Sequence, residues 1–121
     1  MNIAKIMIPK CFTAFLNENQ TVRQGWEVMT RNGYTAIPVI DGEHHYIGCV
    51  SEGDFLWHII ENGNEKDSLR KCENYRIQDI VKTDRYPAVT VNVEMRTLIE
   101  RAEKQNFIPV TDDRGYFIGI V

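Results

Sequence analysis

Ser51 and Asp54 are the residues whose types and spacing most directly indicate chemistry. They follow the apolar run 46–50 and open a segment with helical periodicity. A carboxylate in a first helical turn can accept both hydroxyl hydrogens of a cis-diol, and the free N–H groups there favour an anionic phosphate. The same spacing also fits a helix capping box with Ser51 as N-cap. Both roles are compatible, because Ser51 can cap the helix while Asp54 faces a cleft.

Other residues with chemical potential do not form a catalytic or metal-binding pattern. His44 and His45 are neighbours in an expected hairpin, where adjacent side chains point to opposite faces and chelate poorly. Cys11 and Cys72 have no spacing to a histidine that would indicate a nucleophile, and no Walker A or GxGxxG loop is present. We therefore predict no enzyme, no catalytic cofactor and no metal. Solvated surface is the default expectation for four cations: Lys10, Lys82, Arg85 and Arg114.

The composition fits one small soluble unit. The chain has 121 residues, a net charge of −3 and no apolar stretch near the roughly 20 residues that span a bilayer. Mild acidity argues against a nucleic acid or a membrane surface as partner. Three cysteines without a CxxC pair, together with the absence of a signal-like start, lead us to expect reduced thiols and a cytoplasmic location.

An internal repeat organises the sequence. Residues 37–50 and 108–121 are identical at seven of fourteen positions, and Pro38 and Pro109 give an offset of 71. Upstream, Ile3 and Ile6 match Ile77 and Ile80 at an offset of 74. Two similar units of this size can bury their sheets only by stacking, which predicts an approximate twofold relation and two related clefts at the seam.

Each repeat has the same predicted order of elements. A short apolar segment (12–16, then 88–91) precedes a helix, which in the first repeat runs from an N-cap at Thr21 to a stop at Gly33. Two strands joined by a polar turn follow at 36–50 and again at 107–121. A second amphipathic helix starts after Ser51 and ends near Asn62. By the repeat logic, another helix is expected after Val121.

This doubled pattern resembles the CBS (cystathionine β-synthase) domain. The resemblance rests on the stretches 33–41 and 46–54 and on their second copy at 106–121. It implies an α+β fold of two tandem β-α-β-β-α repeats with pseudo-twofold symmetry, a Bateman module whose last helix is missing at the C-terminus. We expect repeat one at 1–62, a connection at 63–76 and repeat two at 77–121, with homodimerisation through the helices.

The resemblance also implies a ligand site for AMP, ADP, ATP, S-adenosylmethionine or cyclic di-AMP. In relatives that bind nucleotides, the Ser/Thr-x-x-Asp motif contacts the ligand, and the segment before the proline lines the adenine pocket. Carried over to this chain, the implied ligand-binding residues are Thr13, Ala14, Tyr34, Thr35, Ala36, Ile37, Ser51 and Asp54. A second cleft is implied at Asn106, Phe107 and Ile108, where Phe107 replaces the smaller Ala36.

The sequence thus favours a regulatory module that senses an adenosyl nucleotide. Two alternatives stay open at this stage. The chain could be a structural dimerisation module with empty clefts, or a regulatory fragment of a larger enzyme or transporter. Asp54 is the feature that distinguishes the ligand-sensing module from the module with empty clefts, because only a ligand-binding cleft requires a residue that binds ribose.

Overall fold

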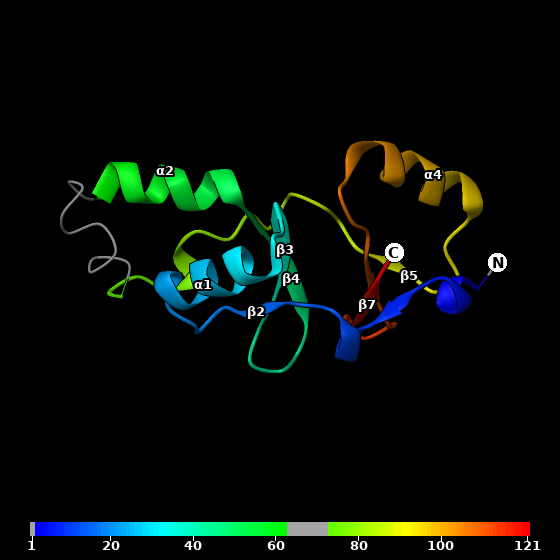
Figure 1. The fold of residues 1–121 in the computed structure, drawn as a ribbon. Helices are drawn as coiled ribbons and strands as arrows, with labels where there is room; N and C mark the ends of the chain where they lie inside the picture. The colour runs from blue at the N-terminus through cyan, green and yellow to red at the C-terminus, as the bar shows by residue number, and fades with distance from the viewer. Residues whose placement is uncertain (1, 63–72) are drawn as a thin grey trace.

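A computed structural model describes residues 2–62 and 73–121, so residues 63–72 of the predicted connection lie outside the described residues. Figure 1 shows two halves side by side, one with α1 and α2 and the other with α4. The helices are η1 (Ile3–Lys5), η2 (Lys10–Phe12), α1 (Val22–Asn32), α2 (Glu52–Asn62), η3 (Ile77–Asp79) and α4 (Met95–Lys104). The strands are β1 (Ile8–Pro9), β2 (Leu16–Asn17), β3 (Ala36–Ile40), β4 (Tyr46–Ser51), β5 (Val89–Thr90), β6 (Pro109–Thr111) and β7 (Phe117–Ile120).

Each half contains one small sheet with the same pairing. In the first half the order is β2-β3-β4, with β2 parallel to β3 and β3 antiparallel to β4. In the second half β5 is parallel to β6, β6 is antiparallel to β7, and β1 adds a fourth strand on β7. The predicted hairpins and the α+β class are therefore confirmed.

Local sequence signals set the ends of the first two long helices as predicted. The Thr21 hydroxyl accepts from the N–H of Gln24, and the Gln24 side chain accepts from the N–H of Thr21, which completes a capping box. Gly33 ends α1 in the left-handed region at φ 67°, where a residue without Cβ pays little strain. At α2, Ser51 and Asp54 form the reciprocal pair that the capping interpretation requires.

The leading segment of each repeat packs into the core of the other. Ile3, at the start of the chain, is fully buried in the second core with Leu98 and Val110. Its repeat counterpart Ile77 is fully buried in the first core, which also contains Phe55. The two repeats therefore complete each other's cores, a relation that brings their strands together at a common seam.

Two glycines at equivalent positions allow these leading segments to approach the strands. A Cβ on Gly48 would collide with the backbone carbonyl of Lys82, and a Cβ on Gly119 would collide with that of Ile8. Gly48 and Gly119 are 71 residues apart, whereas Ile8 and Lys82 are 74 apart, the two offsets found in the sequence. The approximate twofold relation is thus visible in backbone contacts. Among the described residues, no helix combines the length and the apolar character needed to cross a membrane.

Candidate functional site

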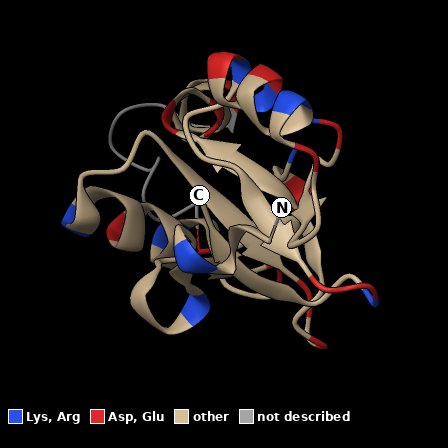
Figure 2. Cartoon of the chain, turned by 90° about the vertical axis from the view of Figure 1, so that its right-hand side faces the viewer, with Lys and Arg blue, Asp and Glu red and all other residues tan. Residues whose placement is uncertain are grey.

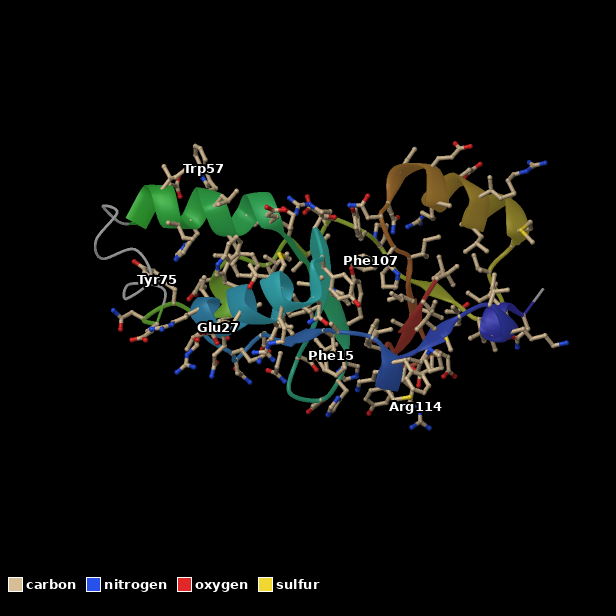
Figure 3. The ribbon with its side chains drawn as sticks, in the orientation of Figure 1. Phe15, Glu27, Trp57, Tyr75, Phe107 and Arg114 are labelled. Carbon is tan, nitrogen blue, oxygen red and sulfur yellow. The ribbon has the colours of Figure 1, made fainter. Side chains whose placement is uncertain are left out.

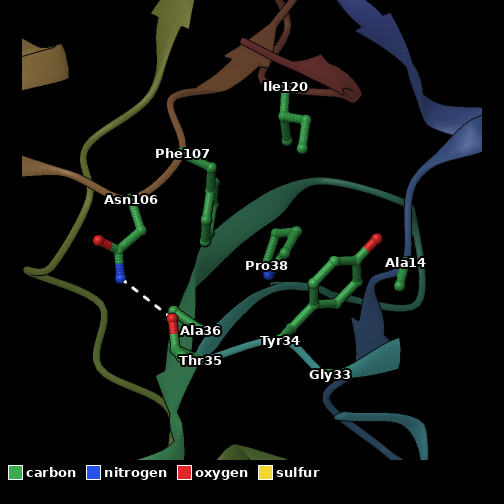
Figure 4. A pocket seen from close by; sticks show the side chains of 9 residues that line it. All are labelled: Ala14, Gly33, Tyr34, Thr35, Ala36, Pro38, Asn106, Phe107 and Ile120. Atoms are coloured by element: carbon green, nitrogen blue, oxygen red, sulfur yellow. Dashed lines mark hydrogen bonds between the residues drawn. The ribbon is translucent and has the colours of Figure 1, made fainter. Parts of the chain in front are cut away.

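A cavity of about 260 Å³ lies where the two repeats meet. Figure 4 shows the residues around it, which come from the segments before β2, β3 and β6, from β3 itself, and from β7. The lining residues are Ala14, Gly33, Tyr34, Thr35, Ala36, Pro38, Asn106, Phe107 and Ile120. Most of this lining is apolar, and the site therefore suits a flat, weakly polar group such as a nucleobase.

Strand geometry decides which residues of β3 face this cavity. Successive side chains on a strand point to opposite faces, so Ala36 and Pro38 line the cavity while Ile37 points away from it. Ile37 is fully buried in the first core against Leu16 and Val50. Because Ala36 contributes only a methyl group, the space above β3 stays open.

The polar groups of the cavity lie along one edge. The side-chain amide of Asn106 donates to the hydroxyl of Thr35 over 3.3 Å, as the dashed line in Figure 4 shows. These residues occupy equivalent places in the two repeats, since they are 71 apart. Tyr34 stands on the neighbouring wall with 42% of its surface exposed. A planar ligand could stack on Tyr34 while its polar atoms face Thr35 and Asn106.

Asp54 lies outside this cavity and is bound to a residue of the second repeat. Its two carboxylate oxygens accept from the Arg85 guanidinium at 2.7 and 3.3 Å, and Oδ2 also accepts from the N–H of Ser51 at 2.8 Å. Its side chain is only 11% exposed. Burial opposes ionisation of Asp54, but the bonds from Arg85 and Ser51 outweigh it and hold the carboxyl pKa below its usual value.

The structure separates the predicted site residues into groups. Ala14, Tyr34, Thr35 and Ala36 line the cavity together with two residues assigned to the second cleft, Asn106 and Phe107. Ser51 and Asp54 form the α2 cap and meet Arg85 instead. Three others do not line the cavity: Thr13, whose hydroxyl donates to the carbonyl of Lys10, and the core residues Ile37 and Ile108.

Sequence reasoning missed two kinds of residue. Pro38 and Ile120 line the cavity, and the two-residue period of the strands was the signal that could have found Pro38. Arg85 was expected on the solvated surface, yet it is the partner of Asp54. No local pattern joins two charges 31 residues apart, so only the fold could identify this pair.

Comparison with known proteins finds a family similarity in the first repeat. Residues 3–61 match the family model described as CBS domain. The curated protein "Cyclic di-AMP receptor B" of Bacillus subtilis (strain 168) is 24% identical over 118 residues, covering 98% of this chain and 78% of the receptor.

Solved structures share the fold over nearly the whole chain. CbpB in complex with c-di-AMP matches with a TM-score of 0.87 and 19% identity, covering 100% of this chain and 78% of CbpB. CBSX2 in complex with AMP matches with a TM-score of 0.74 and 22% identity, covering 99% of this chain and 88% of CBSX2. At such identities the similarity establishes the fold.

Proposed function

We propose that the chain, whose residues 3–61 match the CBS domain model and whose two repeats share one fold, is a regulatory module that binds an adenosyl nucleotide. The cavity between the repeats is the observation that carries this proposal. Its similarity to a cyclic di-AMP receptor, to CbpB in complex with c-di-AMP and to CBSX2 in complex with AMP supports it. We propose binding without catalysis, and a cytoplasmic location in which Cys11 and Cys49 stay free thiols.

The size and lining of the cavity support a base as the group that enters it. Its volume of about 260 Å³ is slightly below the roughly 300–1,000 Å³ of sites that enclose a whole small ligand. We propose that the adenine enters the cavity against Ala36 and Phe107, with Thr35 and Asn106 at its polar edge and Tyr34 beside it. Ala14 closes the far wall. The sugar and phosphate then extend toward solvent. Ligands with one phosphate, such as AMP, and with two phosphates, such as c-di-AMP, can both be accommodated there.

Binding regulates only if the ligand prefers one arrangement of the two repeats. A ligand shifts the equilibrium between two arrangements only as far as its affinities for the two arrangements differ. The cavity walls come from both repeats, as Figure 4 shows for Ala36 and Phe107, so a bound base would contact both at once. We propose that this shared contact couples occupancy to the relative orientation of the repeats.

Isothermal titration calorimetry with AMP, ATP, S-adenosylmethionine and c-di-AMP tests the proposal. We expect at least one of these compounds to bind with a measurable heat. The variant Ala14→Phe should weaken that binding at least tenfold, because the ring fills space at the cavity wall. Ala4→Phe is the matched control, since Ala4 is exposed and lies outside the cavity lining. Absence of heat with all four compounds would exclude the nucleotide-sensing function.

A homodimer is the second part of the proposal, and exposed apolar side chains favour it. Figure 1 shows α2 and α4 along the same face of the molecule, and Figure 3 shows Trp57 pointing away from the body of the protein. Trp57 is 63% exposed, and the other exposed apolar residues of these two helices are Leu56, Ile60, Met95 and Ile99. Large apolar side chains that are exposed on two helices typically mark an interaction site.

We propose that a second copy of the chain covers this helical face. The face is formed by one helix of each repeat, so a twofold axis can bring the two helices of one protomer against those of its partner. Native mass spectrometry or sedimentation tests this, with a dimer expected for the wild type and for Phe12→Glu, an exposed apolar residue outside both helices. Trp57→Glu should give monomers. A monomeric wild type at tens of micromolar would exclude the homodimer.

A further inference from the structure

The approximate twofold axis that places one repeat on the other also places the cavity on a second cleft, which is formed by the equivalent residues of the opposite repeats. The strand registers define the equivalent positions, because Leu16 pairs with Val39 in the first sheet and Val89 pairs with Val110 in the second. Leu16 therefore corresponds to Val89, so the segments 12–14 and 85–87, which precede these strands, correspond as well. By the 71-residue offset, the positions of Ala36 and Phe107 also correspond.

Two aromatic rings occupy the second cleft. Where the first cleft has the small residue Ala36, the second has Phe107, and the ring of Tyr86 packs on it edge to face with centroids 5.0 Å apart. Phe107 is buried together with Ala36 and Cys49, and Tyr86 packs against this cluster. Figure 3 shows Phe107 between the two halves of the molecule. Side-chain size thus separates an open cleft from a filled one.

The backbone and hydroxyl of Tyr86 are held in this filled arrangement. Its φ is 56°, in the left-handed region that bulky residues rarely adopt. The Tyr86 hydroxyl accepts from the N–H of Asn106, and its carbonyl accepts from the hydroxyl of Tyr46 at 2.6 Å. The ring therefore stays in the cleft at a local conformational cost that contacts from both repeats offset.

Arg85, the preceding residue, occupies the polar end of the same cleft. It binds both carboxylate oxygens of Asp54, the residue whose spacing after Ser51 suits a sugar diol. Cys49, which packs beside Tyr86, lies on the strand that leads into this motif. An aromatic ring and a charged donor group from adjacent residues thus take the places that a base and a sugar would take.

The mouth of the second cleft is basic. A hollow of about 400 Å³ in front of Tyr86 is lined by residues that include Arg101 and Lys104 of α4, with Glu100 as an acidic neighbour. Figure 2 shows that α4 carries both charge signs along its length, so the helix as a whole is not a basic face. The cations that line the hollow, Arg85 included, outnumber the carboxylate, and this excess favours an anionic group such as a phosphate.

We propose that the second cleft is a nucleotide site that the chain itself occupies, with the Tyr86 ring in the base position and Arg85 on Asp54. The wild-type protein then binds one ligand per chain, in the open cavity alone. Removal of the Tyr86 ring exposes a second site for a nucleoside phosphate, next to Phe107 and with Arg101 and Lys104 at its mouth. This proposal rests on the proposed function, because it takes binding in the first cleft as its reference.

Stoichiometry of binding to Tyr86→Gly tests the proposal. Glycine removes the ring and also suits the left-handed backbone at this position, so the variant should fold. We expect calorimetry and native mass spectrometry with AMP and with c-di-AMP to give one ligand per wild-type chain and two per Tyr86→Gly chain. Tyr86→Asn, which tolerates the same backbone region, is the second variant, and thermal unfolding of each verifies the fold.

The variant Ala14→Phe provides the matched control. It places an aromatic ring on the wall of the first cavity, so the single wild-type site should be lost or weakened at least tenfold. The double variant Ala14→Phe/Tyr86→Gly should bind one ligand, now in the second cleft.

Each outcome separates this inference from the proposed function. A wild type that binds nothing contradicts the proposed function. A wild type that binds one ligand while folded Tyr86→Gly and Tyr86→Asn also bind one contradicts only the occupied second cleft. Two ligands per wild-type chain would contradict it as well.

Discussion

The ion pair between Asp54 and Arg85 should contribute measurably to stability, and Asp54→Asn is the perturbation that isolates it. Asparagine keeps the shape and leaves an oxygen that can accept from the N–H of Ser51, but it removes the charge that Arg85 binds. Hydrogen bonds to charged groups contribute about 1.5–3 kcal/mol. Because the Arg85 side chain is 33% exposed and solvent screens it, we expect a loss of about 1–2 kcal/mol.

Urea unfolding at pH 7 measures this loss, and a double-mutant cycle with Arg85→Gln separates the pair from the local cap. The coupling energy should be about 0.5 kcal/mol or more, since the two side chains are in direct contact. Asp113→Asn, at an exposed turn position, is the matched control and should change stability by less than about 0.5 kcal/mol. Additive effects of the two single variants would refute the assigned role of the pair.

The pH dependence of this difference has a defined sign. The pKa of Asp54 is lowered in the folded protein, because Arg85 and Ser51 outweigh the opposing effect of burial. A carboxyl with a lowered folded pKa stabilises the protein above its unfolded pKa, which is about 3.9, and the contribution is lost as pH falls through the folded value. The advantage of the wild type over Asp54→Asn should thus be constant from pH 8 to about 5 and shrink in more acidic solution. A difference that grows on acidification would contradict this sign.

Three further predictions concern the seam and the cores. Gly48→Ala and Gly119→Ala should each cost about 1–3 kcal/mol in urea unfolding, because the added methyl group meets a backbone carbonyl; an effect below about 0.5 kcal/mol in both would contradict the close approach. Ile3→Ala and Ile77→Ala should each cost about 2–5 kcal/mol, since each side chain is fully buried in the core of the opposite repeat, whereas Ile6→Ala at an exposed position serves as control. Iodoacetamide at pH 8 should modify exposed Cys11 rapidly and Cys49 slowly, as peptide mass spectrometry can measure, because burial raises the pKa of the Cys49 thiol to about 11; equal rates would contradict this.

Local signals in the sequence were sufficient for the two long helices of the first repeat and for the two hairpins, whereas the apolar segment predicted at 12–16 is a strand only at Leu16–Asn17, after η2. Thr21 and Gly33 bracket α1 because a hydroxyl cap and a left-handed glycine act within one helical turn. The doubled hairpin gave the two sheets, because turn residues and strand-forming runs are also neighbours in the chain. The repeat offsets then indicated that the halves are related, which the matching contacts of Gly48 and Gly119 bear out.

Long-range relations were not accessible in the same way. The apolar character of Ile3 indicates that it is buried, but it does not specify which of two similar cores receives it. The sequence likewise grouped Asp54 with Tyr34 in one cleft, whereas the fold directs Asp54 toward Arg85. Ile37 was included among the ligand contacts although its neighbours Ala36 and Pro38 have the opposite strand orientation. Such assignments depend on which elements meet across the seam.

The crossing of the leading segments determines how this protein can be divided. A cut between the repeats would leave each fragment without the isoleucine that completes its interior, so neither fragment should fold alone, whereas the two mixed together should reassemble. The leading segment of one chain could also pack into the core of a second chain. The interior contacts would then be the same, and only the route of the segment that connects the repeats would differ. Concentrated preparations refolded from denaturant are therefore where intertwined dimers should arise, distinct from any pair formed through the outer helices.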